Sequence, residues 1–301
     1  MARLPLNTLP TFRAVAARAN LRAAAEELHL THSAVSQQIK LLEQQIGFPL
    51  FDRRGRRVVL NAAGAALLRA VEPALAQLDE GLRAAAAASG AGGQRVRLTL
   101  LSSFAQRWLL PRIGRWRERH PDIGLELHTS QVVVDLPREG FHAALRQGDG
   151  QWRGLQSLCL TDSPFIAVGS PQAAQRLRGR DVAALADEPL LGNIAMWQRW
   201  FALQGVRARV NPVAAFNDAG LMLQAVEQNL GLALSREILA ADALRDGRLV
   251  RLSPSVIDAG LGDAYWLAFP PALADWPPLR ALRQWLVDEL AASQQELQAL
   301  R

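Results

Sequence analysis

The sequence is poor in three residue types that often carry chemistry. Its 301 residues include one cysteine (Cys159), one tyrosine (Tyr265) and one lysine (Lys40). A single cysteine excludes an internal disulfide and suits a reducing compartment. No apolar run approaches the roughly 20 residues that cross a bilayer, and the first residues lack the apolar stretch of a secretion signal. These absences predict a soluble, cytoplasmic protein without a membrane partner.

Sequence motifs of common catalytic sites are also missing. The chain has neither the Gly-x-Ser-x-Gly pattern of a nucleophile elbow nor the Gly-x-x-x-x-Gly-Lys pattern of a phosphate-binding loop. The five histidines, at positions 29, 32, 120, 128 and 142, do not have the spacing of metal ligands. We therefore predict that the protein is not an enzyme and has no metal and no cofactor.

Positive charge is concentrated at one end of the chain. Residues 1–60 contain nine basic and four acidic residues, a net charge of +5, whereas the whole chain has a net charge of +6. A basic segment is compatible with a polyanionic partner but does not by itself establish one.

The basic segment has the pattern of three short helices and a hairpin. Side-chain periodicity, with possible helix caps at Asn20, Thr31 and Gly47, predicts these elements. They span Leu6–Arg18, Leu21–Leu28, Thr31 to about Ile46, and Arg53–Leu60 with Gly55 at the turn. Small and apolar residues would form the shared core, namely Ala23, Ala24, Leu28, Val35, Ile39 and Leu42.

The third of these helices carries polar side chains where a core helix would carry bulky ones. Serine and glutamine reach base edges, and basic side chains contact phosphates. Taken singly, the two glutamines are also typical of a solvated helix face, and an arginine run is more often a solvated loop than a nucleic-acid contact. Together, however, these features indicate a helix-turn-helix followed by a basic wing. The predicted DNA-binding residues are Asn20, Thr31, His32, Ser33, Ser36, Gln37, Lys40, Arg53, Arg54, Arg56 and Arg57.

A long helix is predicted over residues 62–88, capped by Asn61 and bent at Pro73. Its apolar residues follow the 3-4 spacing of a coiled-coil seam. They are Leu68, Val71, Leu75, Leu78 and Leu82. We predict that this seam pairs two copies of the chain; the alternative is a single amphipathic helix packed on its own domain.

After the glycine-rich stretch Ser89–Gly93, strand and helix patterns alternate. Strands are expected at Arg95–Leu101 and Ile123–Thr129, with a helix over Phe104–Arg119 between them. The alternation continues to about Phe269 and predicts parallel sheets with crossover helices in two α/β lobes. Pro164–Val168 and Tyr265–Phe269 are the predicted crossings between the lobes, and a last helix is expected from about Leu279 to Leu300.

The order of residue types in residues 4–64 is more specific than a general helix-turn-helix. The distinctive positions are Leu9, Phe12, Ala19, Ala24, Ala25, Leu28, Thr31, Ser33, Ala34, Val35, Ser36, Gln38, Ile39, Leu42, Glu43, Gly47, Leu50, Phe51, Arg53 and Gly64. This pattern resembles the N-terminal domain of LysR-type transcriptional regulators. Asn20, Leu21 and Asn61 depart from it by standing for serine, phenylalanine and threonine.

The remainder of the chain resembles the effector domain of the same family. The stretch FAQRWLLPRIGRWRERHPDIGLEL and residues Ala143–Leu155 and Trp197–Gly205 carry this likeness. They are most similar to the branch that contains the regulators of glycine cleavage and of β-lactamase. His142 and Gln147 depart from that branch, where an aspartate and an aromatic residue are usual.

The resemblance implies a three-part architecture. A winged helix-turn-helix DNA-binding domain (1–61) would be followed by a linker and dimerisation helix with a hinge (62–93), and then by a periplasmic-binding-protein-like α/β effector domain (94–301). Lobe 1 would comprise about 94–164 plus 270–301, and lobe 2 about 165–269. The implied partners are double-stranded promoter DNA, further copies of the chain in a homodimer or homotetramer, RNA polymerase and a small-molecule effector.

A small effector would bind between the two lobes. The positions that match the family's cleft are Ser102, Ser103, Thr129, Ser130, Gln147, Gly148, Asn217, Asp218 and Tyr265. We predict a transcriptional regulator controlled by a ligand in this cleft. The alternative is an architectural or constitutive DNA-binding repressor whose α/β part serves only oligomerisation.

Overall fold

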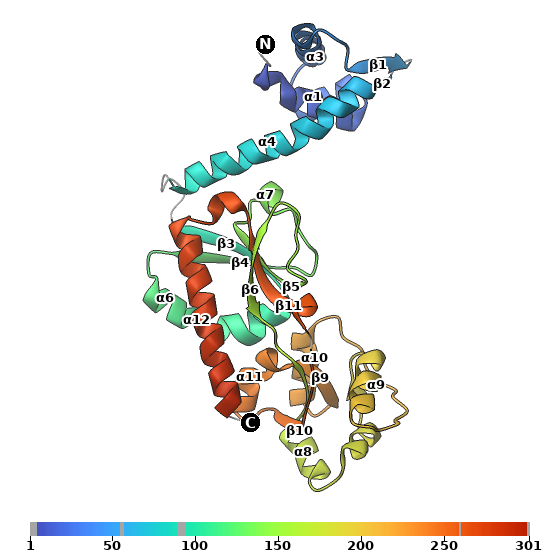
Figure 1. Ribbon diagram of the computed structural model, residues 1–301, viewed down its shortest axis with the longest axis vertical. Helices are drawn as coiled ribbons and strands as arrows, with labels where there is room; N and C mark the ends of the chain where they lie inside the picture. Colours follow the sequence, from blue (N-terminus) through green and yellow to red (C-terminus); the bar gives the residue numbers. More distant parts are fainter. Residues whose placement is uncertain (1–4, 55–56, 89–93, 259, 300–301) are drawn as a thin grey trace. The chain divides into compact units, whose positions relative to one another are not determined.

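The computed structural model describes residues 5–54, 57–88, 94–258 and 260–299. The chain divides into two compact units, one up to Ala85 and one from Ala86 onward (Figure 1). Over the described residues, no helix combines the length and apolarity that a membrane crossing requires.

The first unit consists of a helical cluster, a hairpin and the start of a long helix. Its elements are α1 (Leu9–Arg18), α2 (Leu21–Glu27), α3 (His32–Ile46), β1 (Phe51–Arg54), β2 (Arg57–Leu60) and α4 (Ala62–Ala88). These confirm the predicted elements to within a few residues, except that Leu6–Thr8 is a 3-10 turn. The α-helix begins at Leu9 because Pro10 favours the first turn of a helix. The predicted turn at Gly55 lies outside the described residues.

Side-chain caps determine where the helices of the first unit begin. The Asn20 Oδ1 atom accepts a hydrogen bond from the Arg22 amide at 2.8 Å, and the Thr31 Oγ1 atom accepts one from the Ala34 amide at 3.2 Å. Asn61 caps α4 through the Gly64 amide at 2.8 Å. These bonds satisfy amide groups that the helices themselves leave unpaired.

The core of the first unit lies between α1, α2 and α3. Of the predicted core, Ala24, Val35, Ile39 and Leu42 are buried, and Ala23 and Leu28 are half-buried. Phe12, which is fully buried, fills the centre of the same cluster. The small alanines let α2 approach its neighbours closely, as the sequence predicts.

Gly64 lies where α4 passes close to the segment before β1. A methyl group added there would meet the Leu50 carbonyl oxygen and would lie 2.7 Å from the Leu60 Cδ2 atom. We expect Gly64→Ala to destabilise this unit by about 1–3 kcal/mol through overpacking. Calorimetry of the full chain measures the change.

Gly81 in the same helix provides the matched control for this substitution. Beyond its chain neighbours and the backbone of its own helix turn, no atom of the described residues lies within 4 Å of a Cβ built at Gly81. Gly81→Ala should therefore leave stability unchanged or raise it by about 0.5–1 kcal/mol. Equal melting temperatures for the two variants would contradict the close-approach argument.

The second unit contains two lobes, each built on one sheet (Figure 1). Lobe 1 consists of β3 (Arg95–Leu100), α5 (Ser102–Phe104), α6 (Ile113–Arg119), β4 (Gly124–Thr129), α7 (Leu136–Glu139), β5 (Ala143–Gly148), β6 (Gln156–Thr161), β11 (Ala264–Phe269) and α12 (Pro277–Ala299). Lobe 2 consists of β7 (Phe165–Gly169), α8 (Pro171–Leu177), β8 (Leu190–Leu191), α9 (Ile194–Leu203), α10 (Ala219–Glu227), β9 (Leu232–Arg236), α11 (Glu237–Arg245) and β10 (Val250–Ile257).

Both sheets are mixed, so the prediction of parallel sheets is wrong in part. The strand orders are β4-β3-β5-β11-β6 and β10-β7-β9-β8. β3 runs parallel to β4 and β5, but β11 pairs antiparallel with both β5 and β6. In lobe 2, β7 runs antiparallel to β9 and β10. The strands that run antiparallel to both of their neighbours are β7 and β11. Each is the first strand after the chain crosses from the other lobe.

The lobe boundary also differs from the prediction. The chain crosses between Thr161 and Phe165 and returns between Ile257 and Ala264. The two apolar segments predicted as crossings instead lie largely within β7 and β11, the strands that come directly after the crossings. They are apolar because a strand with neighbours on both sides in a covered sheet is buried. Lobe 2 therefore ends before Ala264. The prediction extended lobe 2 to about residue 269 and so included β11, but β11 belongs to the sheet of lobe 1.

The helix predicted over Phe104–Arg119 is interrupted. After α5 the backbone forms a π-helical turn over Ala105–Leu109 and a 3-10 turn over Leu110–Arg112 before α6 begins. Pro111 lacks an amide hydrogen and cannot continue the α-helical bonding, which explains the break.

A buried ion pair joins the segment before α6 to α11. Both terminal nitrogens of Arg112 donate to the Asp242 carboxylate at 2.8 Å. The Arg112 side chain is 3% exposed and that of Asp242 is 10% exposed. This pair therefore connects α11 of lobe 2 to the segment before α6 in lobe 1.

Candidate DNA-binding face and effector cleft

α3 presents a polar face opposite its buried face. His32, Ser33, Gln37 and Lys40 are exposed and Ser36 is half-exposed. Gln38, the neighbour of Gln37, is half-buried and accepts a hydrogen bond from the Thr11 hydroxyl. The two adjacent glutamines thus differ: Gln38 holds α3 against α1, whereas Gln37 is available to a partner.

The hairpin follows this face in the chain. Its strand register places Arg54 opposite Arg57 and Arg53 opposite Val58. This arrangement provides a basic strand pair beside the helix-turn-helix at the level of the backbone. The contacts of these arginines with DNA stay a prediction, and Arg56 lies outside the described residues.

The predicted seam on α4 divides into two parts. Val71 is 4% exposed, and it packs with the half-buried Leu68 and Leu75 into the core of its own unit. Leu78 and Leu82 are 55% and 70% exposed. The assignment of Val71 to a dimer seam is therefore corrected, because its side chain is already buried. A seam formed by Leu78 and Leu82 stays a prediction.

A cavity of about 380 Å³ lies between the two lobes of the second unit. Of the predicted effector residues it is lined by Ser103, Gln147, Asn217 and Tyr265. These residues come from α5, the end of β5, the segment before α10, and β11. Positions distant in the sequence thus meet where the sheets end, as the prediction of an interlobe cleft requires.

The other predicted effector residues do not line this cavity. They are Ser102, Thr129, Ser130, Gly148 and Asp218. Some serve local structure: Asp218 caps α10 through the Leu221 amide at 3.0 Å, and the Ser130 Oγ atom accepts from the Val132 amide at 3.1 Å. The Gly148 carbonyl accepts from the Trp266 indole at 2.9 Å. The polar atoms of Asp218, Ser130 and Gly148 thus pair with two backbone amides and one indole N–H group.

The cavity also contains charged residues that the sequence prediction missed, namely Arg146, Arg236 and Asp263. Arg236 donates to the Asp263 carboxylate at 2.5 Å, and Gln147 donates to the same carboxylate at 2.5 Å. A sequence signal existed, because Arg146 and Arg236 interrupt the apolar strands AALRQG and LALSR. An arginine within a buried strand needs a compensating partner.

Tyr265 forms an aromatic wall of the cavity. Its ring lies 5.0 Å from that of Phe104 and 5.4 Å from the Arg236 guanidinium carbon. The residue is 2% exposed, and this burial raises the pKa of the Tyr265 hydroxyl well above its ordinary value. The hydroxyl therefore stays protonated at neutral pH and is a neutral hydrogen-bonding group.

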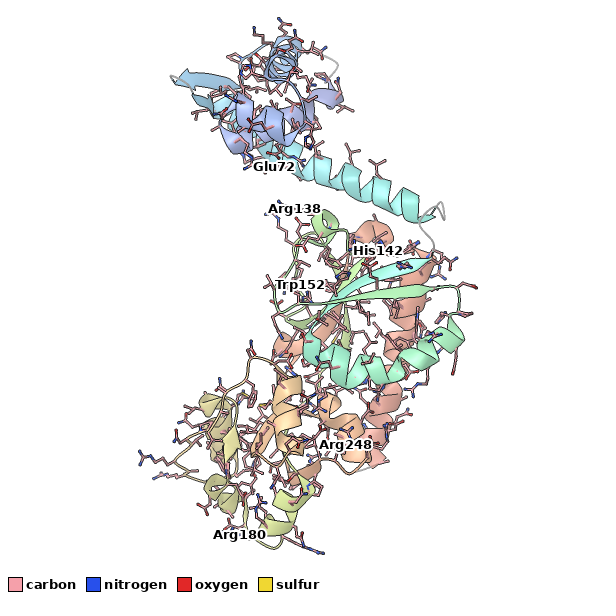
Figure 2. All side chains as sticks on the ribbon, turned by 180° about the vertical axis from the view of Figure 1, so that it is seen from behind. Glu72, Arg138, His142, Trp152, Arg180 and Arg248 are labelled. Atoms are coloured by element: carbon pink, nitrogen blue, oxygen red, sulfur yellow. The ribbon has the colours of Figure 1, made fainter. Side chains whose placement is uncertain are left out.

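His142, the first departure from the branch pattern, lies away from this cavity. Its Nδ1 atom accepts a hydrogen bond from the Arg97 amide at 3.0 Å, and its ring lies 4.7 Å from that of Trp276. Figure 2 shows His142 at the end of lobe 1 that is farther from lobe 2. Gln147, the second departure, does line the cavity. Of the two, only Gln147 is placed to act on a ligand there.

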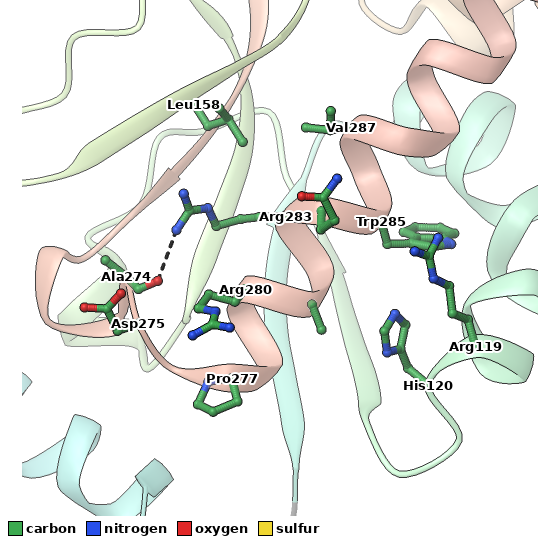
Figure 3. A pocket seen from close by; sticks show the side chains of 12 residues that line it. Arg119, His120, Leu158, Ala274, Asp275, Pro277, Arg280, Arg283, Trp285 and Val287 are labelled. Atoms are coloured by element: carbon green, nitrogen blue, oxygen red, sulfur yellow. Dashed lines mark hydrogen bonds between the residues drawn. The ribbon is translucent and has the colours of Figure 1, made fainter.

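A larger groove of about 800 Å³ runs beside α12 and contains none of the predicted effector residues (Figure 3). Its lining includes Arg119, His120, Arg280 and Arg283. Arg283 donates to the Ala274 carbonyl at 3.0 Å. Burial and the nearby Arg119 lower the pKa of His120. The groove is basic, but it lies within lobe 1 and not between the lobes.

The arrangement defines a class of protein: a helix-turn-helix unit with an exposed polar recognition helix, followed by a two-lobed α/β unit with an interlobe cavity. The family described as "Bacterial regulatory helix-turn-helix protein, lysR family" matches residues 6–65, and "LysR substrate binding domain" matches residues 89–291. The chain belongs to the LysR family of bacterial regulators. It is a DNA-binding transcriptional regulator with an effector-binding domain, and this family is one of regulators rather than enzymes.

Curated relatives extend over almost the whole chain. The HTH-type transcriptional activator AmpR of Citrobacter koseri is 36% identical over 289 residues, covering 94% of this chain and 98% of that protein. The glycine cleavage system transcriptional activator of Escherichia coli K12 is 30% identical over 298 residues, covering 97% of this chain and 96% of that protein. These similarities confirm the predicted likeness to the branch with the β-lactamase and glycine-cleavage regulators.

Solved structures confirm the fold. The effector domain of AmpR from Pseudomonas aeruginosa is 28% identical, with a TM-score of 0.57, and the match covers 67% of this chain and 98% of that one. CrgA from Neisseria meningitidis, a LysR-type regulator, matches 94% of this chain and 98% of its own with a TM-score of 0.53 and 23% identity.

No cluster of three or more residues that could hold a metal ion occurs among the residues that the structure describes.

Proposed function

We propose that α3 reads base pairs in the major groove of promoter DNA and that a small molecule in the interlobe cavity controls this activity. The observation that supports the first part is the division of α3 into a buried face and an exposed polar face of Ser33, Gln37 and Lys40. A recognition helix needs both faces, because one packs on its own domain while the other meets the base edges.

The second part rests on the cavity between the lobes. Its walls come from both lobes, so a ligand that contacts both would favour one relative arrangement of the two. Such a closure would alter how effector domains pack in the oligomer and thereby the spacing of the DNA-binding units. Contact with RNA polymerase would change as a consequence.

Self-association through the end of α4 completes the proposal. Leu78 and Leu82 are large apolar side chains left in solvent on a long helix, and they lie four positions apart on the same face. Two copies that bury these residues would read the two halves of a palindromic site, and pairing of effector domains would give a tetramer.

The substitution Leu78→Asp tests the pairing. We expect the dissociation constant of the dimer to rise at least about 100-fold, since each of two symmetric leucines loses about 1.5–3 kcal/mol of burial. Light scattering of the full chain at several concentrations measures this change. Gln77→Asp is the control with the same added charge at an exposed neighbouring position. An unchanged dimer in the Leu78 variant would show that the interface lies elsewhere.

The alternative function is an architectural repressor without a ligand. Thermal unfolding of the full chain with a panel of metabolites separates the two functions. A reproducible rise in melting temperature with one chemical class supports regulation by a ligand. No rise with any metabolite, together with unimpaired DNA binding, would favour the architectural role.

A further inference from the structure

Three arginines are buried in the part of the chain that the structure describes. Arg112, Arg146 and Arg236 are 2%, 4% and 3% exposed. Arg112 has the carboxylate of Asp242 at 2.8 Å, and Arg236 has that of Asp263 at 2.5 Å. Arg146 is the one among these three without a carboxylate partner.

The hydrogen bonds of Arg146 all go to neutral groups. Its Nη1 atom donates to the Leu145 carbonyl at 3.0 Å, and its Nη2 atom donates to the Thr99 hydroxyl at 2.8 Å and to the Val132 carbonyl at 3.2 Å. The Nε atom has no hydrogen-bond partner. An arginine has five N–H donors and keeps its charge in proteins, so the positive charge here has partial hydrogen bonding and no counter-ion.

The position of this charge is the second observation. Arg146 lines the interlobe cavity, and burial lowers the pKa of its guanidinium without a neighbouring carboxylate to offset the effect. Carboxylates near the cavity are engaged elsewhere: Asp263 accepts from Arg236 and Gln147, and Asp218 caps α10. Leaving a buried charge without a counter-ion is costly, and this charge lies at the wall of the interlobe cavity.

We infer that the effector carries an oxyanion group, a carboxylate or a phosphate, that acts as the counter-ion of Arg146. This inference rests on the proposed function, in which the effector binds in this cavity. Arginine forms short, charge-assisted hydrogen bonds with both anions. Ser103, Gln131 and Asn217, which also line the cavity, provide neutral polar groups for the rest of the ligand. A volume of about 380 Å³ takes one small molecule.

The first experiment compares stability without a ligand. In the full chain, Arg146→Met removes an uncompensated charge, whereas Arg112→Met leaves Asp242 buried without its main partner. We expect Arg146→Met to lower the melting temperature by less than half as much as Arg112→Met. Equal losses would overturn the inference, because Arg146 would then be held by interactions as stabilising as those of a paired buried arginine.

The second experiment uses defined probes on the full chain at constant ionic strength. N-acetylglycine supplies a carboxylate, methyl phosphate supplies a phosphate, and N-acetylglycinamide is the neutral counterpart of the first. At about 10 mM we expect at least one anion to raise the melting temperature of the wild type by about 2 °C, and the amide to have no effect. Whichever anion acts identifies the oxyanion.

The variants decide whether Arg146 is responsible. Arg146→Met should lose the response to the anion, whereas Arg153→Met, at an exposed position of the same lobe, should keep it. An amide as effective as its acid, a response retained by Arg146→Met, or no response to either anion would overturn the inference. Binding of promoter DNA by Arg146→Met separates this result from the proposed function. If this variant binds DNA normally and a neutral metabolite stabilises the protein, the proposed ligand site is retained and only the inference that the ligand is an anion is wrong.

Discussion

The full-length protein with Gln37 replaced by alanine is expected to lose discrimination between its promoter site and a site with one changed base pair. Gln37 is exposed on α3, and its amide has the geometry to donate to and accept from one adenine. We expect a loss of about 1–3 kcal/mol of discrimination for each half-site. Fluorescence anisotropy with matched and mismatched duplexes at fixed salt measures it.

Two comparisons make this expectation specific. Gln45→Ala removes the same amide from an exposed position near the end of α3 and should leave discrimination intact. Arg54→Ala should weaken binding to all sequences alike and reduce the salt slope by about one. If Gln37→Ala and Arg54→Ala lower binding to promoter and random DNA by the same factors, the division between base readout and phosphate contact is wrong.

The substitution Arg112→Met is expected to destabilise the second unit by about 3–5 kcal/mol. Removing one partner of a buried pair leaves the other charge uncompensated. Asp242 would keep a bond to Arg245 at 3.0 Å, but the side chain of that arginine is 47% exposed and cannot replace two buried bonds. Calorimetry or urea denaturation of the full chain measures the loss.

An exposed pair and a double substitution provide the controls. Arg115 pairs with Glu289, but its side chain is 57% exposed, so Arg115→Met should cost no more than about 1 kcal/mol. Adding Asp242→Leu to Arg112→Met should recover much of the stability, because it removes the orphaned carboxylate. A double variant less stable than Arg112→Met would indicate that Asp242 has a separate structural role.

The first unit was largely predictable because its information is local. Asn20, Thr31 and Asn61 cap the helices that follow them, and a cap depends on residues two or three positions away. The polar face of α3 follows from helical periodicity alone. Helical periodicity did not distinguish the roles of the adjacent Gln37 and Gln38. Only the packing of α1 against α3 shows that Gln38 accepts a hydrogen bond from Thr11.

The second unit was predictable as a class but not in its connections. Alternating patterns indicated α/β lobes, yet they did not show that β11 pairs antiparallel between β5 and β6. Strand partners are distant in sequence, and a strand buried on both faces has the same apolar pattern in either direction. For these two reasons the sequence assigned residues 264–269 to the wrong lobe.

The sequence by itself determined the helix-turn-helix, the exposed polar face of α3, the long helix α4 and the two-lobed class, because caps, periodicity and residue order are read along the chain. Only the tertiary structure decided which residues meet. It buried Val71 but left Leu78 exposed, and it brought Ser103, Gln147, Asn217 and Tyr265 to one cavity while Ser130 and Asp218 bonded to nearby backbone. It also left Arg146 without a counter-ion, since pairing of buried charges depends on contacts across the fold and not on neighbours in sequence.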